Sequence, residues 1–237
     1  DTAVKILVDA KRPVIIAGGG VISSGSGKEL TELAELLMAP TATTLMGKGA
    51  IPSNHPMSLG LCGMHGRHEA NYMVPDADVL LVVGARFSDR TTATLSGFAP
   101  TAKIIHIEID RSEVDKNISS LTQVVGDAKH ALAGITKRLK VEIIRKNGWH
   151  KKIAEYRKYC EPYDYGAGIN SPAVMRAIRE ALPSDAFVTT DVGQHQMFAA
   201  QYYKFDKPNR WINSGGLGTM GVGLPAAMGV QLTHPDD

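Results

Sequence analysis

Short apolar runs alternate with amphipathic stretches along the first 140 residues. Residues 14–17, 41–45, 79–83 and 103–110 are predicted strands, and the uninterrupted apolar run at 79–83 is the clearest of them. Residues 27–38 place apolar side chains at helical spacing, and Asp127 stands where it would cap a helix that reaches about Leu139. Residues 46–66, rich in glycine, are predicted to form a long loop. Strands that alternate with helices in this way predict a parallel, three-layer α/β sheet.

The pattern changes after residue 140. Residues 141–170 are a predicted connector, and Trp149, Tyr156 and Tyr159 alternate there with basic side chains, namely Arg145, Lys146, Lys151, Lys152, Arg157 and Lys158. This run is open to interpretation as a nucleic-acid patch, but a solvated connecting helix that packs its aromatic side chains onto the domain is favoured. The stretch from Glu161 to Asn170 is typical of a linker.

A second α/β unit is predicted for residues 171–237. Ser171 is expected to cap a helix that has Pro172 at its first position and ends near Leu182. A strand at 187–190 and a helix to about Tyr203 follow. The last segments are residues 211–214, a glycine-rich stretch at 215–223 and a helix that opens at Leu224.

The composition is that of a globular chain, and it excludes disordered and collagen-like proteins. Hydrophobic residues make up 43% and charged residues 21% of the 237 residues. The net charge of +2 gives no electrostatic case for nucleic acid or a membrane surface, and no apolar run is long enough to span a bilayer. Two distant cysteines, Cys62 and Cys160, indicate a reducing, cytoplasmic location. The ends at Asp1 and Asp237 are expected to be cuts in a longer polypeptide.

Three segments at predicted strand ends are candidates for ligand contact. Gly18-Gly19-Gly20 is either a phosphate- or ribose-binding turn or only a tight turn between a strand and a helix. Gly84 to Arg90 carries two arginines at the carboxyl end of the best strand, where ligands bind in open α/β sheets. Their alternative role is a pair of surface ion pairs with Asp89. Glu108 is placed either to accept hydrogen bonds from a ribose or to cap a loop.

Three further motifs are weaker by themselves. The run His65 to Glu69 lacks the spacing of a metal site and fits better as a glycine-flanked loop along a ligand, so no metal ligands are assigned. Gln194 and His195 open a helix directly after a strand, which suits a phosphate but also a capped, buried histidine. The loop from Ser214 to Gly221 passes Met220 between glycines, and that side chain is either a ligand contact or a core gap-filler.

Taken in order, these motifs resemble the catalytic large subunit of acetolactate synthase (acetohydroxyacid synthase), a family of thiamine-diphosphate enzymes that also hold FAD. The resemblance covers nearly the whole chain, and its two most specific stretches are 191–197 and 214–227. The other matching stretches are 13–20, 44–47, 59–60, 63–66, 84–90, 106–110 and 126–127. It implies that residues 1–140 are a central FAD-binding domain, that 141–170 connect it, and that 171–237 are the truncated start of the thiamine-diphosphate domain.

The resemblance also implies a set of binding residues. Arg86 would face the FAD pyrophosphate, Glu108 the ribose, and Asp127 with Ala128 the adenine end. The full set of implied FAD contacts is Gly19, Thr44, Leu45, Cys62, Gly63, Met64, His65, Gly84, Ala85, Arg86, Phe87, Ser88, Asp89, Arg90, Glu108, Ile109, Asp127 and Ala128. The implied thiamine-diphosphate contacts are Gln194, His195, Gly218, Thr219 and Met220, with Met220 as the wedge that holds the cofactor bent.

The activity implied by the resemblance is the condensation of pyruvate with pyruvate or 2-oxobutyrate, with loss of CO₂, in the synthesis of valine, leucine and isoleucine. Catalytic residues and the ligands of Mg²⁺ are expected outside the fragment, which alone is expected to be inactive. A homodimer or tetramer and a regulatory small subunit are expected partners, and Arg90 is expected to help admit the second 2-oxo acid. The alternatives are a pyruvate oxidase or glyoxylate carboligase, against which the stretch 194–197 argues, or an FAD-binding module without catalysis.

Overall fold

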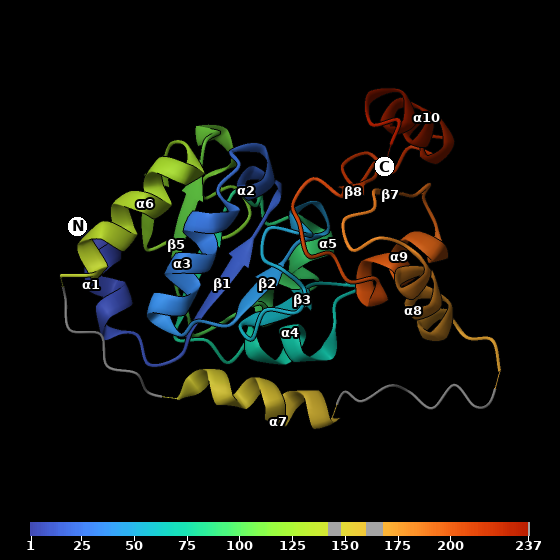
Figure 1. The fold of residues 1–237 in the computed structure, drawn as a ribbon. Helices are drawn as coiled ribbons and strands as arrows, with labels where there is room; N and C mark the ends of the chain where they lie inside the picture. Colours follow the sequence, from blue (N-terminus) through green and yellow to red (C-terminus); the bar gives the residue numbers. More distant parts are fainter. Residues whose placement is uncertain (142–147, 160–167, 237) are drawn as a thin grey trace.

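The structure of the protein, a computed structural model, describes residues 1–141, 148–159 and 168–236 (Figure 1). Its strands are β1 (Pro13–Ala17), β2 (Thr41–Thr43), β3 (Ser58–Leu61), β4 (Val79–Val83), β5 (Lys103–Glu108), β6 (Thr122–Val125), β7 (Val188–Thr189) and β8 (Trp211–Ile212). Its helices are α1 (Thr2–Asp9), α2 (Gly19–Ser23), α3 (Gly27–Leu37), α4 (His68–Met73), α5 (Asp89–Thr92), α6 (Ala128–Leu139), α7 (Lys152–Tyr159), α8 (Ser171–Ala181), α9 (Gln194–Tyr202) and α10 (Gly223–Thr233).

The first unit, residues 1–140, is built on a six-stranded sheet with the order β3-β2-β1-β4-β5-β6. Every neighbouring pair in it is parallel, and Ile15 of β1 stands between Thr41 of β2 and Leu81 of β4. The strand order reverses between β1 and β4, so the carboxyl ends of these two strands face a switch point, where open sheets bind ligands. The predicted parallel α/β fold is confirmed.

Two apolar layers enclose this sheet, one on each face. Ile15, Leu81 and Ile105 face a cluster with α1, α3 and α6, whereas Val14 and Leu80 face a second cluster with α4. Figure 1 shows α1, α3 and α6 together on one side of the sheet and α4 on the other. Because successive side chains of a strand point to opposite faces, a strand covered on both sides reads as an unbroken apolar run.

Two short strands lie where the sequence pattern does not predict them. β3 occupies part of the predicted loop 46–66, so that expectation is wrong for residues 58–61, and β2 ends at Thr43 instead of Leu45. β3 is an edge strand that carries Gly60 at a positive φ of 76°, which weakens its sequence signal. β6, at the other edge, alternates half-buried and exposed residues and has no continuous apolar run.

The connector packs back onto the first unit. Trp149 and Ile153 are buried in the cluster beneath α4, and the Tyr156 ring stacks on Tyr72 at 5.9 Å. Figure 1 shows α7 lying along α4. This packing of Trp149 and Tyr156 agrees with the favoured interpretation of the basic stretch. Arg145, Lys146 and residues 160–167, which include most of the predicted linker, lie outside the described residues, as does the side chain of Tyr159.

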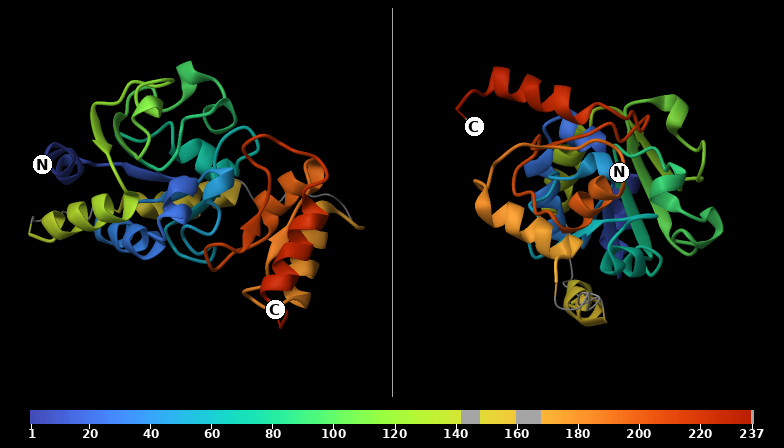
Figure 2. Two further views of the ribbon diagram at one scale, coloured as in Figure 1. Left: turned by 90° about the horizontal axis from the view of Figure 1, so that it is seen from above. Right: turned by 90° about the vertical axis from the view of Figure 1, so that its right-hand side faces the viewer.

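The second unit, residues 168–236, has a two-stranded parallel sheet of β7 and β8 with α8, α9 and α10 around it. Asn170, not Ser171, caps α8, because its Oδ1 accepts a hydrogen bond from the Ala173 amide at 2.9 Å. The prediction missed this cap because both residue types are good caps and they are adjacent. Figure 2 shows α10 on the outside of the unit, and Gly223 is its only buried residue.

A third apolar cluster joins the two units. Leu61 of β3 packs with residues of α9 and with Phe205 and Trp211, and Leu45 flanks them. Polar contacts reinforce it, since the Ser53 amide donates to the Phe205 carbonyl and the Phe205 amide donates to Ser53 Oγ, both at 2.9 Å. The Trp211 indole Nε1–H donates to the Leu45 carbonyl at 3.1 Å. The junction therefore lies beside the loops that follow β2 and β3.

Candidate cofactor site

A cavity of about 780 Å³ lies between the two units. One wall comes from the loops that follow β1, β2, β3, β4 and β5, and the other comes from α9 and the loop 214–218. Its size falls within the usual range of small-molecule and cofactor sites. The lining residues are Gly19, Gly20, Thr44, Leu45, Met46, Leu61, Cys62, His65, Gly84, Ala85, Arg86, Ser88, Asp89, Arg90, Thr91, Glu108, Val192, Gln196, Met197, Ala200, Ser214, Gly215, Gly216, Leu217 and Gly218.

Glycine allows two backbone segments to meet at the floor of this cavity. A Cβ on Gly84, whose φ is +58°, would lie 2.5 Å from the Gly20 Cα. A Cβ on Gly18 would lie 2.1 Å from the Gly84 carbonyl oxygen. Only glycine fits both positions, because such contacts are far shorter than van der Waals distance. The turn after β1 is therefore required for close packing, and the same bare backbone at Gly19 and Gly20 faces the cavity.

The segment after β4 divides its side chains between solvent and core. Arg86 is exposed at the cavity wall, whereas Phe87 is buried and meets the His106 ring edge-on at 4.8 Å. Phe87 adopts a positive φ of 52°, which is costly for a non-glycine residue, and Asn117 Nδ2 donates to its carbonyl at 3.1 Å. The buried His106 has Nε2 2.9 Å from the Ala85 carbonyl, and burial lowers the pKa of its ring. The core therefore holds the backbone of residues 85–87 in place.

The carboxylate of Glu108, at the end of β5, accepts hydrogen bonds from backbone amides through one of its two oxygens. Glu108 is 7% exposed, and its Oε1 accepts hydrogen bonds from the amides of Ile109 and Asp110 at 2.9 and 3.2 Å. Asp127 lies one strand further along the same edge, where it accepts from the His130 amide at 3.1 Å and caps α6 as predicted. Asp127, Ala128 and Ile109 are not among the residues that line the cavity.

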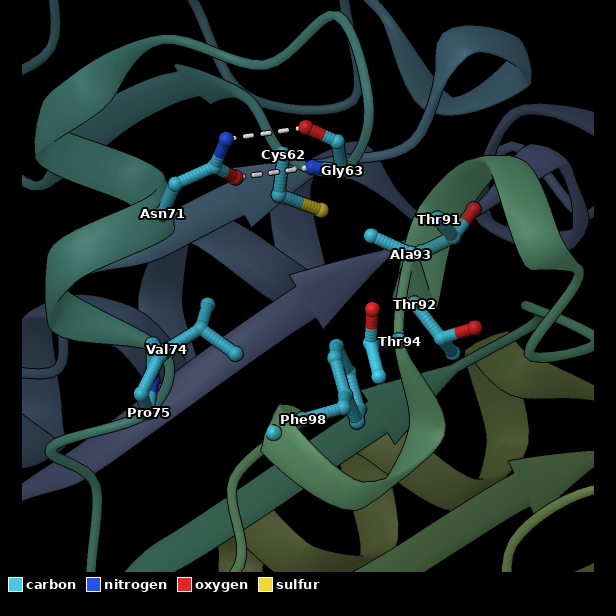
Figure 3. Close-up of a pocket in the computed structure, with 11 residues that line it drawn as sticks. Cys62, Gly63, Asn71, Val74, Pro75, Thr91, Thr92, Ala93, Thr94 and Phe98 are labelled. Atoms are coloured by element: carbon cyan, nitrogen blue, oxygen red, sulfur yellow. Dashed lines mark hydrogen bonds between the residues drawn. The ribbon is translucent and has the colours of Figure 1, made fainter.

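The turn from Cys62 to Arg67 forms the flank of the cavity. Asn71 grips its backbone, since Oδ1 accepts from the Gly63 amide at 2.9 Å and Nδ2 donates to the Gly63 carbonyl at 2.8 Å. Figure 3 shows these two bonds beside a smaller cavity of about 270 Å³, into which the Cys62 thiol points. Burial raises the pKa of that thiol to about 12, so Cys62 stays protonated. Arg90 Nη1 lies 3.3 Å from the Met64 sulfur on the solvent side.

The wall from the second unit is anchored by an acidic side chain. Asp191 accepts hydrogen bonds from the Gly221 amide at 2.7 and 2.8 Å and from the Val192 amide at 3.0 Å. These bonds, the Gly221 contact first, hold the pKa of the Asp191 carboxyl below its usual range. The loop 214–221 is thereby tied to the end of β7, and Met220 at its tip is 79% exposed.

Over half of the predicted binding residues meet at the cavity. The ones that line it are Gly19, Thr44, Leu45, Cys62, His65, Gly84, Ala85, Arg86, Ser88, Asp89, Arg90, Glu108 and Gly218. The ones that do not are Gly63, Met64, Phe87, Ile109, Asp127, Ala128, Gln194, His195, Thr219 and Met220. Gln194 and His195 are exposed at the start of α9.

Several lining residues were not singled out from the sequence. They are Leu61, Thr91, Val192, Gln196, Met197 and Ala200. All of them except Ala200 lie inside a matching stretch or next to a predicted contact, and that proximity was the available signal. Ala200 had no such signal, because its position depends on how the two units dock.

Two other site types find no support in the described part of the chain. No three acidic, histidine or cysteine side chains converge there as they would to hold a metal ion. Nor is any described helix long and apolar enough to cross a membrane.

A doubly wound parallel sheet with a cavity at its switch point, closed by a second α/β unit, defines a cofactor-binding protein of the α/β class. Residues 1–135 match the family model described as "Thiamine pyrophosphate enzyme, central domain", and residues 191–237 match "Thiamine pyrophosphate enzyme, C-terminal TPP binding domain". The chain belongs to the thiamine pyrophosphate enzymes.

Comparison with curated proteins shows which members of this family the chain is similar to. The chain is 45% identical over 242 residues to acetolactate synthase isozyme 3 large subunit of Escherichia coli K12, covering 99% of this chain and 42% of that protein. It is 45% identical over 242 residues to the probable acetolactate synthase large subunit of Methanocaldococcus jannaschii, covering 98% and 41%. To isozyme 1 of E. coli K12 it is 43% identical over 235 residues, covering 96% and 40%. The chain thus spans about 42% of the length of the first relative.

Proposed function

We propose that this chain is part of an acetolactate synthase large subunit, which condenses pyruvate with pyruvate or 2-oxobutyrate and releases CO₂ for branched-chain amino-acid synthesis. The observation that carries the proposal is a cavity of about 780 Å³ with one wall from each unit. The names of the relatives, which share more than two fifths of its residues, support the same activity.

FAD is the proposed ligand of the wall from the first unit. Gly19, Gly20 and Gly84 line the cavity, and the exposed Arg86 guanidinium suits a pyrophosphate. Glu108 keeps one carboxylate oxygen that accepts no hydrogen bond from a described backbone amide, and it is our candidate for the ribose. Asp127 and Ala128 are proposed for the adenine end, since the Gly126 amide donates to the Glu108 carbonyl at 3.0 Å and so joins the two strand ends. The isoalloxazine is proposed to lie toward residues 44–46 and 62–65.

Thiamine diphosphate is the proposed ligand of the wall from the second unit. When bound, it supplies a carbon that can add to a 2-oxo acid and take up the electrons released with CO₂. Gln194 and His195 offer polar groups at the start of α9 for the diphosphate. Gly218, Thr219 and Met220 are proposed to line the bend between the two rings, and the anchor on Asp191 supports a fixed position for that loop. Mg²⁺ and the catalytic residues are proposed to belong to sequence outside residues 1–237.

Arg90 is proposed to admit the second 2-oxo acid. Its carbonyl accepts from the Met64 amide at 2.9 Å, and its guanidinium stays at the cavity wall beside Met64. A guanidinium there is suited to a carboxylate. In the intact polypeptide, Arg90→Ala is expected to raise KM for the second 2-oxo acid about tenfold, with a smaller change in kcat. Arg138→Ala, at an exposed position of α6, is the matched control, and an unchanged KM in Arg90→Ala would contradict the role.

The remaining expectations concern assembly and location. A homodimer or tetramer, a regulatory small subunit and a cytoplasmic location are proposed with the function. The "large subunit" in the relatives' names supports a smaller partner. Size-exclusion chromatography with light scattering of the intact polypeptide measures the oligomeric state directly.

A product assay tests the proposed activity. The intact polypeptide with FAD, thiamine diphosphate and Mg²⁺ is expected to convert pyruvate to acetolactate. Acetyl phosphate would indicate a pyruvate oxidase, and tartronate semialdehyde from glyoxylate would indicate a glyoxylate carboligase. Binding of FAD without any of these products would leave a flavin-binding module and contradict the proposed enzyme.

A further inference from the structure

Two hydrogen bonds cross from the flank of the cavity to helix α9. Gln201 Nε2 donates to the His65 carbonyl at 2.7 Å, and Arg67 Nη1 donates to the Gln201 carbonyl at 3.5 Å. The two bonds run in opposite directions between the same two segments. The turn Cys62–Arg67 and the last part of α9 are therefore joined at two points rather than one.

The end of this bridge on the first unit is rigid. Glu69 is 2% exposed, and its Oε1 lies 2.7 Å from Arg67 Nε. Arg157 of α7 approaches the same oxygen at 3.9 Å. A buried carboxylate held by guanidinium groups costs free energy to disturb, so it fixes the Arg67 side chain. The Arg67 amide also donates to the Leu61 carbonyl at 2.7 Å.

The same turn is also fixed beside the smaller cavity. Asn71 holds both polar groups of Gly63, and the Gly66 amide donates to the Gly63 carbonyl at 2.8 Å. His65 lies between these anchors and lines the larger cavity. A shift of its carbonyl would therefore move a cavity-lining residue relative to α9.

The other end of the bridge belongs to the opposite wall. Gln196, Met197 and Ala200 of α9 line the cavity, and Gln201 is four residues beyond Met197 on the same helix face. Ala200 is also fully buried in the cluster that joins the units, so the helix that carries the lining residues packs directly against the first unit. Gln201 thus connects a helix of one wall to a turn of the other.

We propose that Gln201 is a positioning residue that couples the two walls, so that a ligand on the thiamine side strengthens binding on the flavin side. The proposal rests on the proposed function, since it takes FAD and thiamine diphosphate as the two ligands. Such coupling is reciprocal, and each ligand raises the affinity of the other by the same factor. Gln201 touches neither ligand in this account and acts through His65.

The test is the FAD affinity of the intact polypeptide, measured by quenching of flavin fluorescence with and without saturating thiamine diphosphate and Mg²⁺. For the natural sequence we expect thiamine diphosphate to tighten FAD binding about tenfold. The measured quantity is the ratio of the FAD dissociation constants without and with thiamine diphosphate. Gln201→Leu removes the donor to His65 but leaves the carbonyl that Arg67 contacts, and in this variant we expect the ratio to fall to about twofold or less. Gln201→Met, closer in shape, is expected to behave alike and covers the case in which the leucine variant fails to fold.

Gln231→Leu is the matched control, because Gln231 is an exposed glutamine of α10 whose Nε2 donates, among the described residues, to the nearby Pro235 carbonyl. Its ratio is expected to equal that of the natural sequence. An undiminished ratio in the Gln201 variants would overturn the proposal while the proposed function stands, as would binding of both ligands without coupling in the natural sequence. A natural sequence that binds neither ligand would overturn both.

Discussion

The two units share one α/β architecture but differ in what stabilises them. In the first unit the sheet has six strands, and buried clusters cover both of its faces. In the second unit the sheet has two strands, and Leu224, Met228 and Leu232 of α10 are 74%, 59% and 84% exposed. The first unit thus encloses its own core, whereas the best-buried residues of the second lie at its contact with the first. Within residues 168–236, the buried packing near the cavity therefore comes from the contact with the first unit.

The two units also contribute different kinds of structure to the cavity. The first unit contributes rigid loop ends of strands, and the second contributes a helix and a glycine-rich loop that complete the cavity. A site made this way depends on both the packing beneath β4 and the junction between units. Substitutions at the two places separate these two dependences.

Gly84→Ala is expected to destabilise the first unit by about 3 kcal/mol or more, because its Cβ would meet the Gly20 Cα at 2.5 Å and φ is +58°. Urea unfolding followed by circular dichroism measures the loss. Gly97→Ala is the control, since nothing lies within 4 Å of a Cβ there. A loss below about 1 kcal/mol in Gly84→Ala would contradict the close approach of the two backbones.

Phe205→Ala is expected to undock the second unit at a cost of about 3 kcal/mol, because Phe205 is 2% exposed in the joining cluster. Hydrogen exchange should then rise in α9 and stay unchanged in β1 and β4. The control, also made in the chain of residues 1–237, is Leu232→Ala on the exposed face of α10, which should change stability by less than about 0.5 kcal/mol. Equal effects of the two substitutions on stability would contradict the conclusion that the second unit depends on its contact with the first.

Lys48→Met is expected to stabilise the junction by about 2 kcal/mol at pH 6. Lys48 is 7% exposed, its Nζ lies 5.3 Å from the centre of the Phe205 ring, and burial, with the Arg67 charge, lowers its pKa from 10.5 to about 7. Between pH 7 and 10.5 the Lys48 amine is protonated in the unfolded chain but largely neutral in the folded one. Stability of the natural sequence should therefore rise with pH over this range.

The methionine variant should lack that rise between pH 7 and 10. Thermal melts at several pH values measure it. Lys137→Met, at an exposed position near the end of α6, is the control and should keep the rise. If Lys48→Met keeps the pH dependence of the natural sequence, the amine is not the group responsible.

Asp191→Asn is expected to have the smallest and most local effect, faster hydrogen exchange at Gly221 and its neighbours. The carboxylate accepts from the Gly221 amide, which lowers its pKa, so this contribution is present at neutral pH and is lost as pH falls through the folded-state pKa. The hydrogen-exchange rates at Gly221 in Asp191→Asn and in the natural sequence, each corrected for the intrinsic effect of pH, should therefore become equal as the pH is lowered from 7. Asp185→Asn, which breaks an exposed ion pair with Lys207, should leave Gly221 unchanged.

Much of the first unit could be predicted from the sequence, because buried strands such as 79–83 and the capped helix after Asp127 carry strong local signals. The edge strands could not, since β3 contains Gly60 and β6 has a half-exposed pattern. Arg86 and Glu108 were predictable as cavity residues because Glu108 ends β5 and Arg86 follows the end of β4. Ala200 and Gln201 were not, because their roles exist only after two distant segments dock.

A calorimetric titration of the intact polypeptide with FAD tests the central claim most directly, which is that the cavity between the units is a flavin site. The natural sequence should bind one FAD per chain, and Arg86→Ala should weaken binding about tenfold, as expected for the loss of a charged partner of phosphate. Arg138→Ala, remote on α6, should bind as the natural sequence does. Absence of saturable binding by a folded protein, or equal affinity in Arg86→Ala, would contradict the account.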